Sequence, residues 1–140
     1  MKVIIAQDWL LLAIDDGIGP IKLQKALFLF SQESGAPAGQ KYEFVPYNWG
    51  AMSAQIYDDL GKLRDADLVK FEPSGRGWND YRLTSTGKQR ALQLRGTANQ
   101  ELVAKLNEVC DFVQSRDFEK LLEDVYEKYP SYATKSLFRR

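Results

Sequence analysis

Few of the side chains that usually perform chemistry are present in this chain of 140 residues. It contains no histidine, so the commonest general base and metal ligand is missing. The single cysteine, Cys110, falls in an apolar helical pattern and is expected to be a buried small hydrophobe rather than a nucleophile. A zinc site would then depend on carboxylates alone. We expect no catalytic residue, no metal and no cofactor, and we interpret the protein as a binding module rather than an enzyme.

The acidic and glycine-rich motifs do not suggest an active site either. Asp15–Asp16 and Asp58–Asp59 are adjacent pairs, and adjacent helical residues point about 100° apart, so neither pair is a ready two-carboxylate site. We expect the first pair in a solvated turn and the second on a solvated helix face. Residues 74–77 contain two glycines, but they lack the length and the Lys-Ser/Thr ending of a phosphate-binding loop.

Basic residues are concentrated in one segment, although the whole chain has no net charge. Residues 62–96 contain eight basic and four acidic residues, a net charge of +4. Residues 1–61 contain four basic and seven acidic residues (−3), and residues 97–140 contain seven and eight (−1). Zero overall charge argues against a protein held to nucleic acid by bulk charge. It does not exclude local contact through the basic segment.

The apolar spacing predicts helices over Ile5–Ile14, over Pro20 to Ser34, and after Ser53 as N-cap. The second helix has a wide apolar arc, with Lys22, Gln24 and Lys25 placed off it. Leu68–Phe71 and Tyr81–Thr84 are predicted strands on either side of the turn-forming residues 73–77, which gives a hairpin with an exposed tip. Ser85 or Thr86 starts another helix, and two apolar-striped helices follow, the second capped by Asp117.

This order predicts a mainly α (α+β) fold: a winged helix-turn-helix-like core over residues 1–96, with the hairpin as the wing. Residues 97–140 are expected to form a C-terminal extension of two helices packed on the same domain. Such helices often pair across a two-fold axis, so a homodimer through them is predicted. The N-terminal apolar stretch is broken by Gln7 and Asp8, and no run of eighteen apolar residues occurs, so we expect no membrane association and a cytoplasmic location.

The predicted wing is one candidate binding site, because glycines allow close approach to phosphates and arginine binds them in bidentate fashion. Its tip and flanks, together with outward positions of the third helix, supply the candidate nucleic-acid or partner-binding residues Gln55, Lys62, Arg76, Trp78, Arg82, Lys88 and Arg90. The alternative is a solvated hairpin whose arginines pair with acidic helices. Asp58 and Asp59 beside Lys62 would oppose insertion of the third helix into DNA.

Aromatic residues supply a second candidate site. Tyr42, Phe44, Tyr47 and Trp49 lie in a segment that contains Pro46, which permits at best a short edge strand. Most of these rings are expected in the core, and those left exposed would suit a protein partner. The candidate partner-binding aromatics are Tyr47, Trp49, Tyr132 and Phe138.

Two stretches resemble known families. Tyr81-Arg82-Leu83-Thr84 followed by Gly87 resembles the second wing strand of winged-helix regulators. Residues 21–29, Ile-Lys-Leu-Gln-Lys-Ala-Leu-Phe-Leu, follow a Gly-Pro turn and precede Asn48-Trp49-Gly50 and Ala66-Asp67-Leu68-Val69. This pattern resembles the Panacea (SocA-like) antitoxin domain, although Trp49-Gly50-Ala51 stands where that family commonly has Tyr-Gly-Pro.

The second resemblance implies protein binding, typically to neutralise a toxin or to adapt a target to a protease. We therefore expect an antitoxin-like or adaptor-like protein-interaction domain. The alternative is a DNA-binding transcriptional regulator that uses the basic wing.

Overall fold

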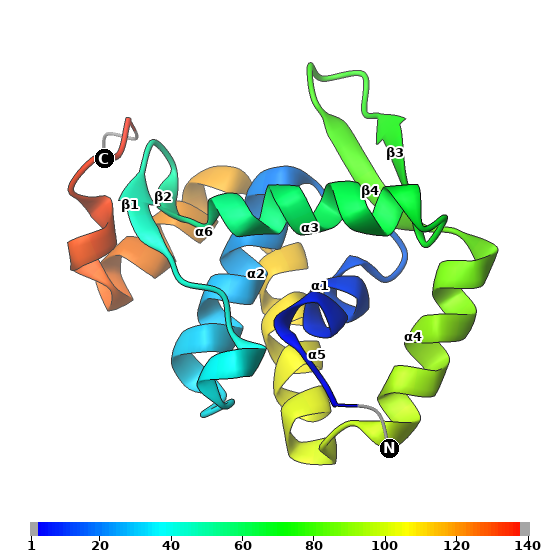
Figure 1. The fold of residues 1–140 in the computed structure, drawn as a ribbon. Helices are drawn as coiled ribbons and strands as arrows, with labels where there is room; N and C mark the ends of the chain where they lie inside the picture. Colours follow the sequence, from blue (N-terminus) through cyan, green and yellow to red (C-terminus); the bar gives the residue numbers. More distant parts are fainter. Residues whose placement is uncertain (1–2, 138–140) are drawn as a thin grey trace.

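The computed structural model describes residues 3–137, which have a mainly helical α+β fold with two antiparallel hairpins (Figure 1). The helices are α1 (Ala6–Ile14), α2 (Pro20–Glu33), α3 (Ala54–Asp65), α4 (Ser85–Thr97), α5 (Gln100–Gln114) and α6 (Phe118–Lys128), with 3-10 turns η1 (Ala38–Gln40) and η2 (Pro130–Ala133). The strands are β1 (Val45–Tyr47), β2 (Gly50–Met52), β3 (Val69–Pro73) and β4 (Asn79–Leu83). Hairpin β1–β2 precedes α3, and hairpin β3–β4 follows it and projects from the body (Figure 1).

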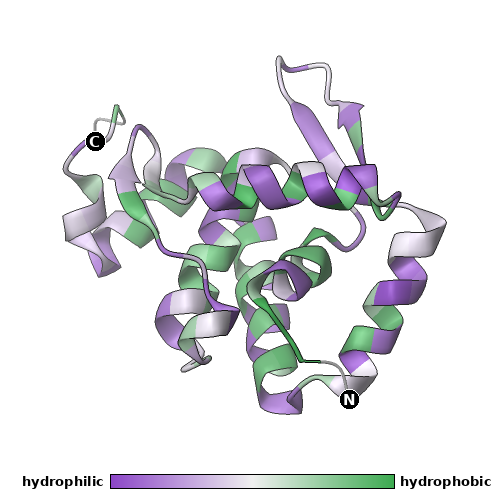
Figure 2. Ribbon diagram, in the orientation of Figure 1, coloured by the Kyte–Doolittle hydropathy of each residue, from purple (hydrophilic) through white to green (hydrophobic). Residues whose placement is uncertain are grey.

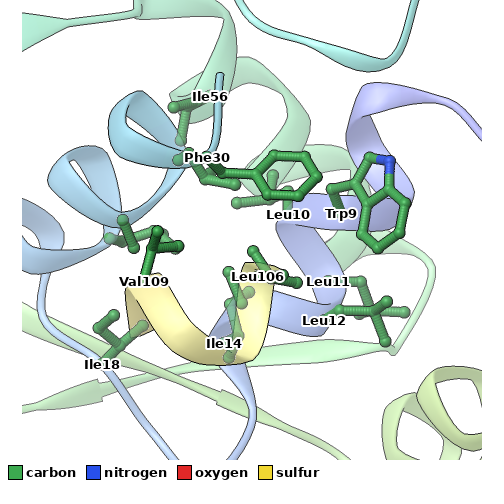
Figure 3. Close-up of a cluster of buried hydrophobic side chains, with 14 of the residues drawn as sticks. Trp9, Leu10, Leu11, Leu12, Ile14, Ile18, Phe30, Ile56, Leu106 and Val109 are labelled. Carbon is green, nitrogen blue, oxygen red and sulfur yellow. The ribbon is translucent and has the colours of Figure 1, made fainter. Parts of the chain in front are cut away.

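Helix α1 supplies the centre of the hydrophobic core because its residues 9–14 are all apolar and all buried. Ile56 of α3, Phe30 of α2 and Leu106 of α5 belong to the same cluster (Figure 3). Full burial of one large apolar side chain stabilises a fold by about 1.5–3 kcal/mol. The apolar faces of the helices are accordingly turned toward this centre, and their polar residues lie mostly outside (Figure 2).

The two C-terminal helices complete this core. Helix α5 packs along α2 and buries Val103, Leu106, Val109 and Val113, while α6 buries Leu121, Leu122, Val125 and Tyr126. The apolar stripes of both helices are thus buried within the chain. Asp117 caps α6 as predicted, since its carboxylate accepts a hydrogen bond from the Lys120 amide at 2.8 Å.

The predicted fold-back between residues 68 and 84 is confirmed. Strands β3 and β4 pair antiparallel from Val69 opposite Leu83 to Pro73 opposite Asn79. The turn between α1 and α2 joins the same sheet through a single bridge, in which Ile18 and Tyr81 exchange two backbone hydrogen bonds of 3.0 and 2.9 Å. The hairpin is therefore tied to the α1–α2 turn and also contacts α1, α3 and α4.

The Thr-x-x-Gly ending of β4 has a local structural reason. The Thr84 hydroxyl oxygen caps α4 by accepting from the Gly87 amide at 2.9 Å, and the Thr84 amide donates to the Leu68 carbonyl at 3.0 Å. A Cβ at Gly87 would overlap that same Leu68 carbonyl oxygen. Glycine is thus required where α4 crosses the start of the hairpin.

The second hairpin corrects the sequence prediction. Pro46 restricts β1 to three residues, as expected for an edge strand, but residues 50–52, for which no strand was predicted, form β2 and pair with it. Gly50 has φ +93°, which closes the turn at Asn48–Trp49. Ser53 occupies the N-cap position of α3, yet its side chain makes no capping hydrogen bond.

Candidate functional site

Exposed apolar side chains gather at the end of the molecule formed by β1–β2. We call this group the hairpin patch; its members are Val45, Tyr47, Trp49, Phe118 and Leu137. Val45 and Tyr47 alternate along β1, so they share a face of the strand, and they are 56% and 48% exposed. The Trp49 ring meets Phe118 of α6 edge to face, with centroids 5.4 Å apart. Leu137 joins the group because its amide donates to the Asn48 carbonyl at 2.8 Å.

The structure separates the four sequence-predicted aromatics. Tyr47 and Trp49 are exposed members of the hairpin patch. The half-buried Tyr132 packs on Phe28, with ring centroids 4.6 Å apart, and so contributes to an internal aromatic cluster. Phe138 lies outside the described residues. Phe118 and Leu137 were missed, because only their positions in space, not their spacing in sequence, bring them beside β1–β2.

Two side chains of α2 hold the outer edge of β2 and the residue after it. The Gln24 amide oxygen accepts from the Ser53 amide at 2.9 Å, and its Nε2 donates to the Ser53 carbonyl at 3.0 Å. The Lys25 Nζ donates to the Ala51 carbonyl at 3.2 Å. These groups satisfy backbone atoms that a third strand would otherwise pair. The prediction that Gln24 and Lys25 lie off the buried arc is wrong, since both are buried.

Lys25 is an unusual buried cation. Its side chain is only 2% exposed, and burial alone lowers its pKa to about 8. No carboxylate among the described residues forms an ion pair with it at 4.0 Å or closer. A Cβ at Gly50 would lie 3.1 Å from Lys25 Cε and 3.0 Å from the Tyr126 ring, so the lysine stem is enclosed between β2 and α6.

The tip of β3–β4 is open, as predicted for Arg76 and Trp78. Both side chains are exposed, and the Arg76 guanidinium lies 5.0 Å from the Trp78 ring centroid. Arg82 is differently placed: its Nε pairs with Glu72 at 3.0 Å and its guanidinium donates to the Asp16 carbonyl. Arg82 therefore ties the hairpin to the α1–α2 turn, and its ion-pair partner is a residue of the hairpin itself, whereas the alternative had predicted a partner in an acidic helix.

Helix α4 does not bring Lys88 and Arg90 together. Its inward face contains Gly87, Ala91 and Leu94, and the two cations stand on opposite flanks, about 160° apart around the helix. Both are exposed. The helix contains three basic residues and no acidic residue, yet its charge is divided between two directions rather than joined into one stripe.

The solvent-facing side of α3 is less acidic than predicted. Asp59 is buried, where it accepts hydrogen bonds from the Tyr42 hydroxyl at 2.6 Å and the Gln55 amide at 2.9 Å. The expectation of a fully solvated Asp58–Asp59 pair is therefore wrong for Asp59. The Gln55 side chain is held beside Asp59 by this hydrogen bond, although the residue is exposed. Lys62 is also exposed, and its Nζ lies 3.9 Å from an Asp59 carboxylate oxygen. Burial, followed by the nearby Asp59 carboxylate, raises the Tyr42 pKa above its usual value.

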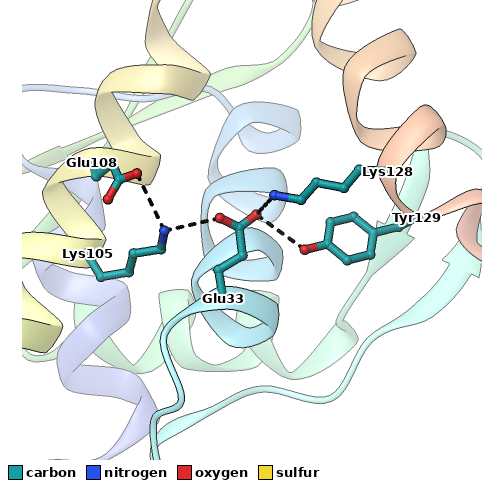
Figure 4. A network of polar contacts seen from close by, with 5 residues as sticks. All are labelled: Glu33, Lys105, Glu108, Lys128 and Tyr129. Atoms are coloured by element: carbon teal, nitrogen blue, oxygen red, sulfur yellow. Dashed lines mark hydrogen bonds and ion pairs between the residues drawn. The ribbon is translucent and has the colours of Figure 1, made fainter.

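A charged network joins α2, α5 and α6 on another side (Figure 4). Glu33 pairs with Lys105 at 3.2 Å and with Lys128 at 2.9 Å, and it accepts from the Tyr129 hydroxyl at 3.2 Å. Burial acts to raise the Glu33 pKa, but the hydrogen bonds from the two lysines lower it overall. The adjacent pocket has a volume of about 220 Å³, which is smaller than that of ordinary ligand sites. Its apolar lining residues include Leu29, Val109 and Val125. The network therefore links α2, α5 and α6 to one another.

The single cysteine is placed where burial shields it from reaction. Cys110 is half-buried on α5, and burial raises its pKa to about 12, which keeps the thiol protonated and unreactive. Among residues 3–137, no three His, Cys, Asp or Glu side chains are grouped as a metal site. No helix in the same range is long and apolar enough to cross a membrane.

Comparison with protein-family models, with curated proteins and with solved structures finds no match for this chain. The Panacea and winged-helix resemblances therefore stay predictions from the residues that carry them.

Proposed function

We propose that this protein is a non-catalytic, winged-helix-like module that binds a protein partner through the hairpin patch, in the manner of an antitoxin or adaptor. The scaffold part of the proposal is supported by the order α1, α2, α3 and hairpin β3–β4. The Ile18–Tyr81 bridge supports it further, because it joins the turn between the first two helices to the hairpin that would be the wing.

The exposed apolar character of β1–β2 carries the functional proposal. Contiguous apolar side chains on a surface mark binding sites, and tyrosine and tryptophan are favoured as interface anchors. Val45, Tyr47 and Trp49 come from one short hairpin, and Phe118 and Leu137 extend the same surface from α6 and the C-terminal segment. The hairpin is held by Gln24 and Lys25, so the resemblance to a Lys-Leu-Gln-Lys helix and the exposed rings concern one structural unit.

Co-expression with the products of neighbouring reading frames tests the proposal, because an antitoxin-like protein should co-purify with a small toxin. We expect a complex with the native chain and at least about tenfold weaker binding after Val45→Ser with Tyr47→Ser, the loss expected from a few anchors. Leu92→Ser is the matched control, since Leu92 is an exposed apolar residue of α4. Equal binding by the patch variant, or no protein partner in a pull-down from the native host, would contradict the proposal.

DNA binding is a second candidate function, favoured by one observation: the open hairpin tip with Arg76 and the exposed cations of α4 lie in the segment of net charge +4. Against it, the outward face of α3 presents Asp58 and Asp65, which a polyanion would repel. Titration of a labelled duplex at about 50 mM and about 200 mM salt decides this point. Binding that weakens with salt and with Arg76→Ala would favour DNA; no binding at the lower salt would remove this candidate.

A further inference from the structure

We propose that hairpin β1–β2 is a latch on α2, which opens by withdrawing Gly50 and Ala51 from Lys25 and so alters the hairpin patch offered to a partner. Its effect on binding rests on the proposed function, but the opening itself is a property of the chain alone.

Few apolar side chains of the hairpin reach the core. Between Val45 and Met52, the only fully buried residues are Gly50 and Ala51, which have almost no side chain to contribute to the core. Gly50 lies against the Tyr126 ring, and the hairpin also contacts η2. Its polar attachments include the Gln24 and Lys25 hydrogen bonds and the Leu137–Asn48 backbone bond, and Trp49 adds the ring contact with Phe118. Segments with few buried apolar contacts open locally at lower free energy than the core of a protein.

Lys25 opposes the closed state when it carries a proton. An ammonium group has three N–H donors, and the structure gives Lys25 one hydrogen bond, to the Ala51 carbonyl. Burying a charge without a charged partner is costly. Opening would return the group to water, where its pKa is that of an ordinary lysine, instead of the value of about 8 in the closed state.

Within residues 3–137, no acidic side chain forms an ion pair with Lys25. Burial is what lowers its pKa. From α6, the facing titratable group is Tyr126, whose pKa is raised by burial. From β2, the neighbours are Gly50 and Ala51, which do not titrate. Protonation of Lys25 therefore favours the open latch, and deprotonation favours the closed one.

The direction and size of the pH effect follow from linkage. From about pH 7 to about pH 9 the closed form loses the Lys25 proton, while the open form keeps it. The equilibrium constant for opening should then fall about tenfold over this interval. A latch that opened without exposing Lys25 would show no such change.

Hydrogen exchange of the amides of residues 50–53, corrected for intrinsic rates, tests the latch near pH 7 and near pH 9. We expect much weaker protection than in α5, and protection that rises about tenfold toward the higher pH. Lys25→Met should abolish this rise. Gln24→Leu is a second variant, which should lower protection at both pH values but keep the rise, because Lys25 is still present.

Two results would overturn the proposal. One is protection of residues 50–53 equal to that of α5, since the hairpin would then open only with global unfolding. The other is protection of the native hairpin that does not change with pH. Either result would leave partner binding by a permanently closed hairpin patch untouched, because that proposal is tested by complex formation and by Val45→Ser with Tyr47→Ser.

Discussion

Polar side chains buried in this protein hold backbone and loops in place. Gln24 and Lys25 bind the carbonyl and amide groups of residues 51 and 53, and Asp59 receives the Tyr42 hydroxyl from the loop before β1. The functions of these residues depend on segments at least seventeen positions away in the chain. A rule that places polar residues on the solvent side of a helix therefore fails at these positions, although it works for most of α5 and α6.

The first prediction concerns how much the burial of protonated Lys25 lowers the free energy of unfolding. The folded chain loses the Lys25 proton at about pH 8, whereas the unfolded chain keeps it until about pH 10.5, so native stability should rise with pH between these values. Lys25→Met removes this dependence. Urea unfolding at about pH 7 and about pH 10.5 should show the native chain gaining about 3 kcal/mol relative to the variant. A constant difference between the two proteins would contradict the burial of a titrating lysine.

A second prediction concerns the bond from Tyr42 to Asp59. Tyr42→Phe removes a hydrogen bond to a buried carboxylate and should lower the free energy of unfolding by about 1.5–3 kcal/mol. Tyr47→Phe removes the same hydroxyl from an exposed ring and should change stability by less than about 0.5 kcal/mol. Denaturant titration of both variants measures the two changes in the free energy of unfolding. Equal changes would contradict a stabilising hydrogen bond from Tyr42 to Asp59.

At the scale of elements, apolar spacing, capping residues and turn residues together were enough to predict the approximate positions of the six described helices and of hairpin β3–β4. The turn glycines at residues 75 and 77 and the alternating strand residues on each side are local signals. Hairpin β1–β2 had no comparable signal, because residues 50–52 contain no β-branched residue and their pairing is completed by side chains of α2. Three of the five members of the hairpin patch were missed: Val45 lies in β1 of this same hairpin, and Phe118 and Leu137 reach the patch only through tertiary packing.

The crossing of α4 over the base of β3 gives a third prediction. Gly87→Ala should destabilise the protein by about 2–3 kcal/mol, because the added methyl group meets the Leu68 carbonyl rather than a side chain that can move. Gly96 lies in the same helix with nothing near its missing Cβ, so Gly96→Ala should be neutral or stabilise by up to about 1 kcal/mol through helix propensity. Thermal unfolding compares them, and similar effects at both positions would contradict the close contact.

At the scale of the whole molecule, α3 separates two surfaces of different character. Twelve residues of helix span about 18 Å, so hairpin β1–β2 at one end and hairpin β3–β4 at the other form distinct sites. The first offers exposed apolar side chains, and the second offers Arg76 and Trp78 at an open tip. A protein partner and a polyanion would therefore contact different ends of the molecule, which allows one experiment to discriminate between them.

Hydrogen–deuterium exchange of the chain, alone and bound to the partner recovered by co-purification, tests the location of the binding site most directly. Our account predicts slower exchange on binding over residues 45–52, the start of α6 and the segment around Leu137, with no change over residues 73–79. The opposite pattern, with protection of the β3–β4 tip and α4 and none at β1–β2, would contradict the assignment of partner binding to the hairpin patch.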